Sequence, residues 1–422
     1  MRDGTEGGPP SATDAAAALK VAAQLGDRHL SSAACKKPCA EQPWRVGCRP
    51  SAHAAGLGEL GAEHLTRFER ASVLPQSARY LVFSTGGGFG NQLAVLIAFT
   101  LAALLSQRIP VLLPGFAEAG ELAFDLRHYF QSSIFPFHGS PSIRNAIAQA
   151  EAHRGLSYKT LPCAACPQVQ VNETALLAAL SRNDAQVVRV FDWESRYTNY
   201  PEARVKALLQ VAVELKLPAV QKLFAKHSNA YRTLLKLLLQ PTPLLTRALS
   251  PHRMATAPPT VAVHIRTGDK AMLVGQMQEA TRLRDKTGSQ GIKCGGVGSM
   301  ELPQARDQLL NCVARFAGNR SIFFASDNAL LGKDAARRFG SQMLPSPPGV
   351  PMHTFRAMDK MRNASTPGFQ PHLKQMVDFV LLASAPSLML TCGSFGDSAW
   401  ALGASATATR YSPQLCEALM KQ

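Results

Sequence analysis

The chain has 422 residues, of which 46% are apolar, and this is enough for about two or three globular domains with sizeable cores. Its 45 Lys and Arg residues exceed its 29 Asp and Glu residues, so the formal net charge is +16. This balance suits nucleic acid, an anionic surface or an acidic small molecule. Because the sequence has neither zinc-finger spacing nor a long basic helix, nucleic acid is disfavoured as a partner.

The amino-terminal part of the chain, residues 1–75, is predicted to form a poorly ordered stem. Ala, Gly and Pro dominate it and aromatic residues are scarce, so it has little apolar surface to bury. Met1–Ala18 lacks the apolar core of a signal peptide. The longest apolar run, Leu93–Leu105, is too short to span a bilayer. We therefore expect no membrane span in this chain.

Residues 76–250 are predicted to form the first of two α/β domains. Strands are expected at Tyr80–Phe83 and Val111–Leu113, and between them lie a glycine loop and a long apolar helix, Asn91–Gln107. This order of strand, loop, helix and strand is typical of a parallel sheet.

The middle of the chain, roughly residues 115–250, is predicted to be more helical and more irregular than the parts around it. The clearest helices are expected at Ala203–Lys216 and Ala219–Leu239. The proline-rich stretch from Pro251 to Pro259 is predicted to be a linker into the next domain.

Residues 251–422 are predicted to form a second domain of the same kind. Its clearest helix is Leu373–Ser384, where apolar residues recur at the spacing that lets one helix face pack on a sheet. The expected strands are Thr260–Ile265, Ser321–Ala325 and Ser387–Thr391.

The glycine loop before the long helix is a candidate ligand site. Gly86, Gly88 and Gly90 allow the backbone to approach a ligand, and the helix that follows presents its first amides there. The spacing is not Gly-x-Gly-x-x-Gly, and no acidic residue follows about twenty positions on, so a nicotinamide cofactor is disfavoured. No Gly-Lys-Ser or Gly-Lys-Thr is present, which excludes a P-loop. A tight turn of purely structural purpose remains the alternative.

The strand Thr260–Ile265 ends in a run of charged residues. His264, Arg266, Asp269 and Lys270 lie in or directly after it, with Gly268 able to turn the backbone. Ligands of open α/β sheets bind at the carboxyl ends of strands. An arginine there suits a diphosphate, because its guanidinium gives forked, charge-assisted hydrogen bonds. The alternative is a polar turn that leads into solvent.

A succession of short motifs resembles a known enzyme family. These motifs are Gly88-Phe89-Gly90-Asn91-Gln92, His264-Ile265-Arg266-Thr267-Gly268-Asp269, Ala325-Ser326-Asp327-Asn328 and Gly393-Ser394-Phe395-Gly396. Their order resembles that in the superfamily of α-1,2-, α-1,6- and protein O-fucosyltransferases, over about residues 78–113 and 260–405. Thr267 stands where that family often has a second arginine.

The resemblance implies a fold, a reaction and a set of site residues. The fold would be GT-B-like α/β, with two Rossmann-like parallel-sheet domains facing a cleft. The reaction would be inverting transfer of fucose from GDP-fucose to a hydroxyl of a glycan or protein, with the acceptor on the first domain and the nucleotide sugar on the second. The residues expected to act in catalysis are Arg266, which would bind the β-phosphate, Asn91 and Asp269. Those expected to bind substrate are Gly88, Gly90, Gln92, His264, Lys270, Asp327, Ser394 and Phe395.

Several of these residues have structural alternatives. His264 is equally well explained as a packed core residue, and Asp327 and Asn91 as helix caps. No Asp-x-Asp pair occurs in the sequence, so we expect no metal, with Arg266 in the place of a cation. Asp269, Glu194 and Asp397 are the candidates for a general base.

Two other functions remain open. Gly396-Asp397-Ser398 superficially matches the nucleophile turn of a serine hydrolase, although the sequence has no Gly-x-Ser-x-Gly elbow. The chain could also be a binding protein that keeps the nucleotide-sugar fold without turnover.

The cysteines and glycosylation triplets suggest a compartment. Cys163 and Cys166 are expected to be a small disulfide or two free thiols rather than a metal site. Three triplets, which begin at Asn172, Asn319 and Asn363, match the N-glycosylation pattern. Together they are compatible with the secretory pathway, and we expect the Golgi lumen.

Overall fold

The computed structural model describes residues 58–85, 89–112, 126–132, 137, 141–153, 158–160, 173–182, 184–190, 201–217, 230–254, 261–266, 303–345, 372–391, 393–403 and 408–421. Most of the segment expected to form a poorly ordered stem lies outside these residues. Its last part is helical, because Gly58–Val73 forms helix α2. Leu60 and Ala71 of this helix are fully buried, so α2 belongs to the packed domain.

The first sheet has four parallel strands in the order β2-β1-β5-β4. Successive residues of β1 alternate between its two faces: Leu81 and Phe83 belong to the cluster around helix α3, whereas Tyr80 and Val82 pack with α2 and α4. Helices therefore cover both faces of the sheet, which explains why β1 is apolar along its whole length. The elements are β1 (Tyr80–Phe83), β2 (Ile109–Leu112), β4 (Tyr158–Thr160), β5 (Val187–Val190), α3 (Phe89–Leu105), α4 (Pro141–His153) and α5 (Glu173–Arg182).

Helix α3 runs through the centre of the first domain. Apolar residues occur on all sides of α3, and every residue of the helix except Asn91 is buried. This is expected of a helix surrounded by protein. It begins at Phe89, two residues before the predicted start. Just after it, Arg108 is fully buried and donates hydrogen bonds to the carbonyl oxygens of Leu180, Tyr80 and Ala185.

The middle of the chain is largely helical but also supplies two strands that were not predicted, because β4 and β5 belong to the first sheet. The two predicted helices appear as α6 (Pro201–Glu214) and α8 (Ala230–Leu238). Residues 218–229 lie outside the described part. The small antiparallel pair is β3 (Phe130–Gln131) and β6 (Gln240–Pro241).

The predicted linker is wrong at Pro251, which lies inside helix α9 (Pro243–Met254). Leu245 and Leu249 of α9 are fully buried, and the helix packs against α14. Burial of this apolar face outweighs the intrahelical hydrogen bond that proline removes. The rest of the predicted linker lies outside the described residues.

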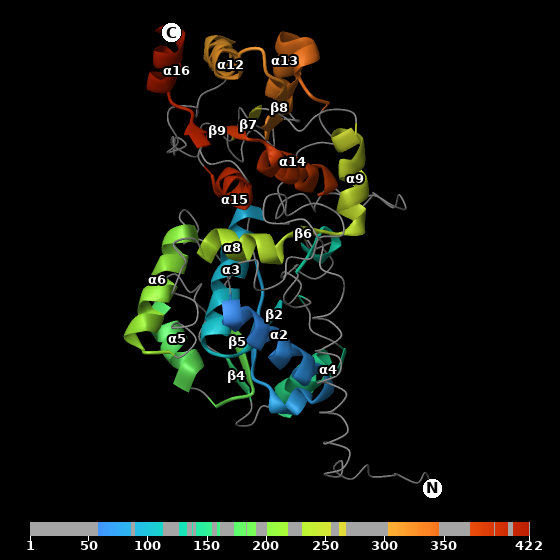
Figure 1. Ribbon diagram of the computed structural model, residues 1–422, viewed down its shortest axis with the longest axis vertical. Helices are drawn as coiled ribbons and strands as arrows, with labels where there is room; N and C mark the ends of the chain where they lie inside the picture. The colour runs from blue at the N-terminus through green and yellow to red at the C-terminus, as the bar shows by residue number, and fades with distance from the viewer. Residues whose placement is uncertain are drawn as a thin grey trace, which may run out of the picture.

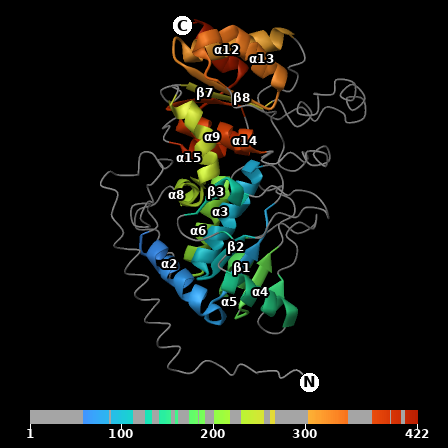
Figure 2. The same cartoon turned by 90° about the vertical axis from the view of Figure 1, so that its right-hand side faces the viewer.

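The second sheet has four parallel strands in the order β10-β9-β7-β8. Helices α12, α13 and α16 cover one face, and α14 and α15 cover the other (Figures 1 and 2). The predicted strands and the helix Leu373–Ser384 are confirmed. The elements are β7 (Val261–Ile265), β8 (Ile322–Ser326), β9 (Ser387–Leu390), β10 (Ala408–Arg410), α12 (Pro303–Ala317), α13 (Ala329–Phe339), α14 (Leu373–Ser384), α15 (Ser394–Leu402) and α16 (Pro413–Lys421).

The two sheet domains share one apolar core. Helix α15 of the second domain packs against α3 and α8, and Figure 2 shows α14 and α15 between the second sheet and the first domain. The expected α/β fold with two Rossmann-like parallel-sheet domains is confirmed, and the cleft expected between them in a GT-B-like arrangement stays a prediction. The boundary expected at residue 250 stays a prediction.

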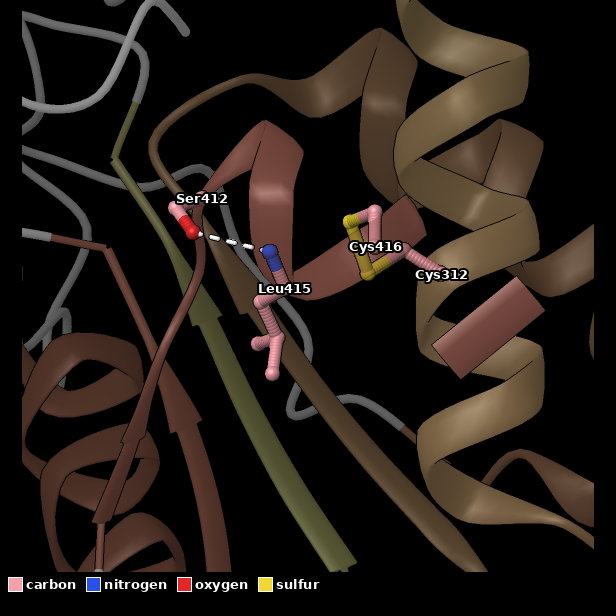
Figure 3. The surroundings of a disulfide bond; sticks show 4 residues. All are labelled: Cys312, Ser412, Leu415 and Cys416. Carbon is pink, nitrogen blue, oxygen red and sulfur yellow. Dashed lines mark hydrogen bonds between the residues drawn. A yellow bond between two sulfur atoms is a disulfide. The ribbon is translucent and has the colours of Figure 1, made fainter. Parts of the chain in front are cut away.

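A disulfide bond joins Cys312 in α12 to Cys416 in α16 (Figure 3). The sequence did not predict this pairing, because connectivity cannot be read from spacing. The Ser412 hydroxyl accepts a hydrogen bond from the Leu415 amide at 3.0 Å and so caps α16. The disulfide thus holds the final helix on the outer face of the second sheet. Among the described helices, none is long and apolar enough to cross a bilayer.

Candidate functional site

The carboxyl ends of β7 and β9 hold the central residue of the site, Arg266. Because the two strands are parallel neighbours, the residues that follow them lie at the same edge of the sheet. The Thr391 hydroxyl accepts a hydrogen bond from the Arg266 amide at 2.7 Å. The Thr391 amide in turn donates to the His264 carbonyl at 3.0 Å. Thr391 therefore fixes the backbone from which the arginine projects.

Gly393 lies directly against the Arg266 side chain. Its φ is +140°, and a Cβ atom at this position would lie 3.4 Å from Cδ and 3.5 Å from Nη1 of Arg266. The arginine therefore passes directly over the residue that precedes α15. The first amides of α15 have no intrahelical acceptor, and the helix dipole adds positive charge there. Guanidinium and helix terminus together concentrate positive charge that could hold an anion.

A second helix begins at the same place. A Cβ atom on Gly90, in the first turn of α3, would lie 2.5 Å from the Phe395 amide nitrogen and 2.5 Å from the Ser394 hydroxyl oxygen. The Ser394 hydroxyl donates to Asn91 Oδ1 at 3.0 Å. Asn91 is the third residue of α3, so the alternative that it caps this helix is wrong. The amino ends of α3 and α15, one from each domain, are therefore in contact.

His264 is packed beneath this site. Its ring lies 5.1 Å from that of Phe395, and Nδ1 has no hydrogen-bond partner among the residues that the structure describes. Burial, with a smaller contribution from the charge of Arg266, lowers the pKa of His264 to about 3. The side chain is therefore neutral at physiological pH, which supports the interpretation as a core residue over a cationic phosphate contact.

Phe395 belongs to an aromatic cluster at the domain interface. Its ring meets those of Phe379 at 5.4 Å and Phe89 at 5.9 Å. Phe89 also contacts Phe130 at 6.1 Å. These rings anchor the start of α15 to the start of α3. Gln92, which follows Asn91 in α3, is also buried. Its Oε1 accepts a hydrogen bond from the Thr85 hydroxyl at 3.5 Å.

Asp327 follows β8 and is buried. Because β8 pairs with β7, with Ser326 opposite Ile265, Asp327 lies at the same sheet edge as Arg266. The cap of α13 is Asn328, whose side chain accepts from the Leu330 and Leu331 amides at 3.0 and 3.1 Å. The alternative that Asp327 caps this helix is therefore wrong.

The Gly396-Asp397-Ser398 segment does not form a nucleophile site. Ser398 is fully buried and its hydroxyl lies 3.0 Å from that of Tyr231, so the serine hydrolase alternative is wrong. Asp397 forms an ion pair with Arg410, and burial raises the pKa of the Asp397 carboxyl despite that cation. The remaining predicted site residues, Gly88, Asp269, Lys270 and Glu194, lie outside the described residues.

Thr391 and Gly393 are functional candidates that sequence reasoning did not select, although Gly393 stood in a quoted motif. A threonine directly after a buried strand was the available signal for Thr391. Which amide its hydroxyl would meet depends on the pairing of β7 with β9, and a single sequence does not give that pairing.

Comparison with known proteins gives a fold likeness at low identity. No family model matches the sequence, and no curated protein matches it. Among solved structures, a mutant of Arabidopsis thaliana FUT1 in complex with GDP is 13% identical, with 96% of this chain and 80% of that one covered and a TM-score of 0.45. POFUT1 in complex with GDP-fucose is 14% identical, with 79% and 97% covered and a TM-score of 0.40. The fucosyltransferase NodZ from Bradyrhizobium is 13% identical, with 77% and 92% covered and a TM-score of 0.41.

Proposed function

We propose that this chain is a glycosyltransferase that moves fucose from GDP-fucose to a hydroxyl of a glycan or protein, with inversion and without a metal ion. The observation that carries the proposal is the position of Arg266. Its side chain lies over Gly393, immediately before α15, and Asp327 lies on the neighbouring strand end. The sequence motifs around these residues resemble those of fucosyltransferases in the same order.

The geometry suits the departure of a nucleoside diphosphate. Negative charge grows on the diphosphate as the bond to the sugar breaks, and fixed positive charge there lowers the barrier. Arg266 would supply a forked, charge-assisted contact. The first amides of α15 would supply aligned dipoles in place of a metal ion.

The other residues have supporting roles in this proposal. Asp327 would accept hydrogen bonds from the guanine or the ribose. Thr391 and Gly393 position Arg266, because Thr391 holds its backbone and the left-handed backbone of Gly393 lies against its side chain. Asn91, on the first domain, would contact donor or acceptor beside Ser394.

The acceptor would bind on the first domain. A carboxylate within hydrogen-bond reach of the attacking hydroxyl would serve as general base. Asp269 and Glu194 remain the candidates, because the Asp397 carboxylate is already engaged by Arg410.

We further propose a lumenal, secretory location. The disulfide between Cys312 and Cys416 supports it, since such bonds persist in oxidising compartments and are rare in the cytosol.

The central test compares Arg266 variants of the full chain. Calorimetry would measure GDP binding, and fucose transfer to an acceptor panel would measure activity with and without EDTA. Arg266→Ala should weaken both by about 100-fold, and Arg266→Lys, which keeps charge but loses the fork, by about 10-fold. Arg337→Ala, which removes an exposed arginine of α13, should change neither.

Full GDP binding and transfer by Arg266→Ala would overturn the assignment of the site. GDP binding by the unaltered chain with no transfer to any acceptor would instead favour a binding protein. Loss of transfer in EDTA would contradict metal independence.

A further inference from the structure

The turn between α12 and β8 presents an unused side chain to solvent. Helix α12 ends at Ala317 and Gly318 follows with φ +59°, so the chain reverses before it enters β8. Asn319 is exposed at this turn, and its carboxamide forms no hydrogen bond with any residue that the structure describes. Nothing in the proposed transfer reaction uses it.

The next residue turns away and leaves Asn319 accessible. Arg320 donates to the Ala317 carbonyl at 2.9 Å and to the Ser387 hydroxyl at 3.2 Å. Its guanidinium carbon also lies 5.6 Å from the centre of the Phe316 ring. The bulky middle residue of the triplet Asn319-Arg320-Ser321 is thus fixed against the helix end, away from the asparagine.

The triplet is of the type that accepts an N-linked oligosaccharide. Such triplets are frequent by chance, and exposure and compartment decide whether one is used. The helix that leads into this turn carries Cys312 of the disulfide. Disulfide formation and oligosaccharide transfer to asparagine share the oxidising secretory compartment.

The location of Asn319 is compatible with a large substituent. It precedes the amino end of β8, whereas Asp327 and Arg266 lie at the carboxyl ends of β8 and β7. Five residues of strand separate the two ends. Helices α12 and α13 lie on the face of the second sheet opposite the first domain (Figure 2). A glycan at this turn would extend into solvent without covering the candidate site.

We propose that Asn319 is an N-glycosylation site, a modification that rests on the proposed secretory location. The donor is an oligosaccharide linked through its C1 to a lipid diphosphate. The Nδ2 atom of Asn319 forms the bond to C1, the bond between C1 and the phosphate oxygen breaks, the lipid diphosphate leaves, and Nδ2 releases one proton.

The test expresses residues 1–422 in eukaryotic cells behind a cleavable secretory leader. Treatment with an amidase that removes N-glycans converts the modified asparagine to aspartate, which adds about 1 Da to the peptide that carries Asn319. Asn319→Gln and Ser321→Ala should each abolish this mass change. Ser321→Thr, which keeps the required hydroxyl, should retain it.

A glycan at Asn319 that Ser321→Ala abolishes supports the proposal, while GDP binding tests the transferase proposal separately. An unmodified Asn319, or a glycan that persists in Ser321→Ala, overturns the proposal.

Discussion

The Ser394 hydroxyl donates a hydrogen bond to Asn91 Oδ1 at 3.0 Å, and these residues are 303 positions apart in the sequence. One begins the helix after β9 and the other lies in the first turn of the helix after β1. The bond therefore joins the two sheet domains at the candidate anion site, and it couples domain contact to the geometry of that site.

The bond between Asn91 and Ser394 should show as a measurable coupling energy. Asn91→Ala and Ser394→Ala remove its two sides, and the double variant should be less destabilised than the sum by about 1 kcal/mol. Denaturant unfolding would give the three free energies. Ser384→Ala serves as control, because that hydroxyl donates to the Leu381 carbonyl within α14. The loss of unfolding free energy caused by Ser384→Ala should add to that caused by Asn91→Ala. If the losses caused by Ser394→Ala and Asn91→Ala also simply added, the prediction would be contradicted.

Gly393→Ala should damage both stability and nucleotide binding. A side chain at φ +140° is strained by about 1–3 kcal/mol, and relief of that strain would shift the backbone that lies in contact with Arg266 Cδ. Gly318→Ala is the matched control, since Gly318 also has positive φ but no atom of the described residues lies within 4 Å of its Cβ position. Both variants should unfold more easily, and only Gly393→Ala should weaken GDP binding in calorimetry. Equal GDP affinity in the two would show that Gly393 does not position Arg266.

Gly90→Ala should disrupt the contact between the two helix ends. The new Cβ would lie 2.5 Å from backbone atoms of Ser394 and Phe395, so the backbone of one helix must move. We expect a loss of several kcal/mol, about 3 or more, in the free energy of unfolding. Gly332→Ala lies in helix α13, where the described part of the chain places no atom within 4 Å of the new Cβ. This substitution should instead stabilise by about 0.5–1 kcal/mol. A change of the same sign in the free energy of unfolding of both variants would refute the close approach at Gly90.

The buried His264 should make the fold sensitive to acid. Its pKa is lowered from 6.5 to about 3, first by burial and then by Arg266. The folded protein therefore keeps His264 neutral in a range where the unfolded chain protonates it. Its contribution to stability is complete above about pH 6.5 and is lost as the pH falls through this range toward 3. Each such histidine should lower the free energy of unfolding by about 1.4 kcal/mol per pH unit.

Chemical unfolding at several pH values between these limits would measure that slope. His264→Gln should reduce this slope by the contribution of one proton, about 1.4 kcal/mol per pH unit. His64, whose pKa burial and Arg67 likewise lower to about 3, should give a separate reduction of the same sign. A slope left unchanged by His264→Gln would mean that His264 is not buried as described.

Much of the secondary structure follows from local pattern. Tyr80–Phe83 and Leu373–Ser384 have the predicted bounds, because apolar spacing records which side of each segment faces the core. Predictions that depended on proline and on caps were less successful. Pro251 is inside a helix and Asn328 rather than Asp327 is the cap, since packing and a one-residue shift in helix start decide such details.

The sequence by itself determined that Arg266 follows a buried strand, that glycines precede two helices, and that each half of the chain alternates strands and helices. These are properties of neighbours along the chain. Tertiary structure alone decided that Gly90 touches Ser394, that Thr391 holds the Arg266 amide, and that Ser398 is closed off by Tyr231. Such contacts join residues up to hundreds of positions apart, and they depend on strand order and helix packing, which local spacing does not encode.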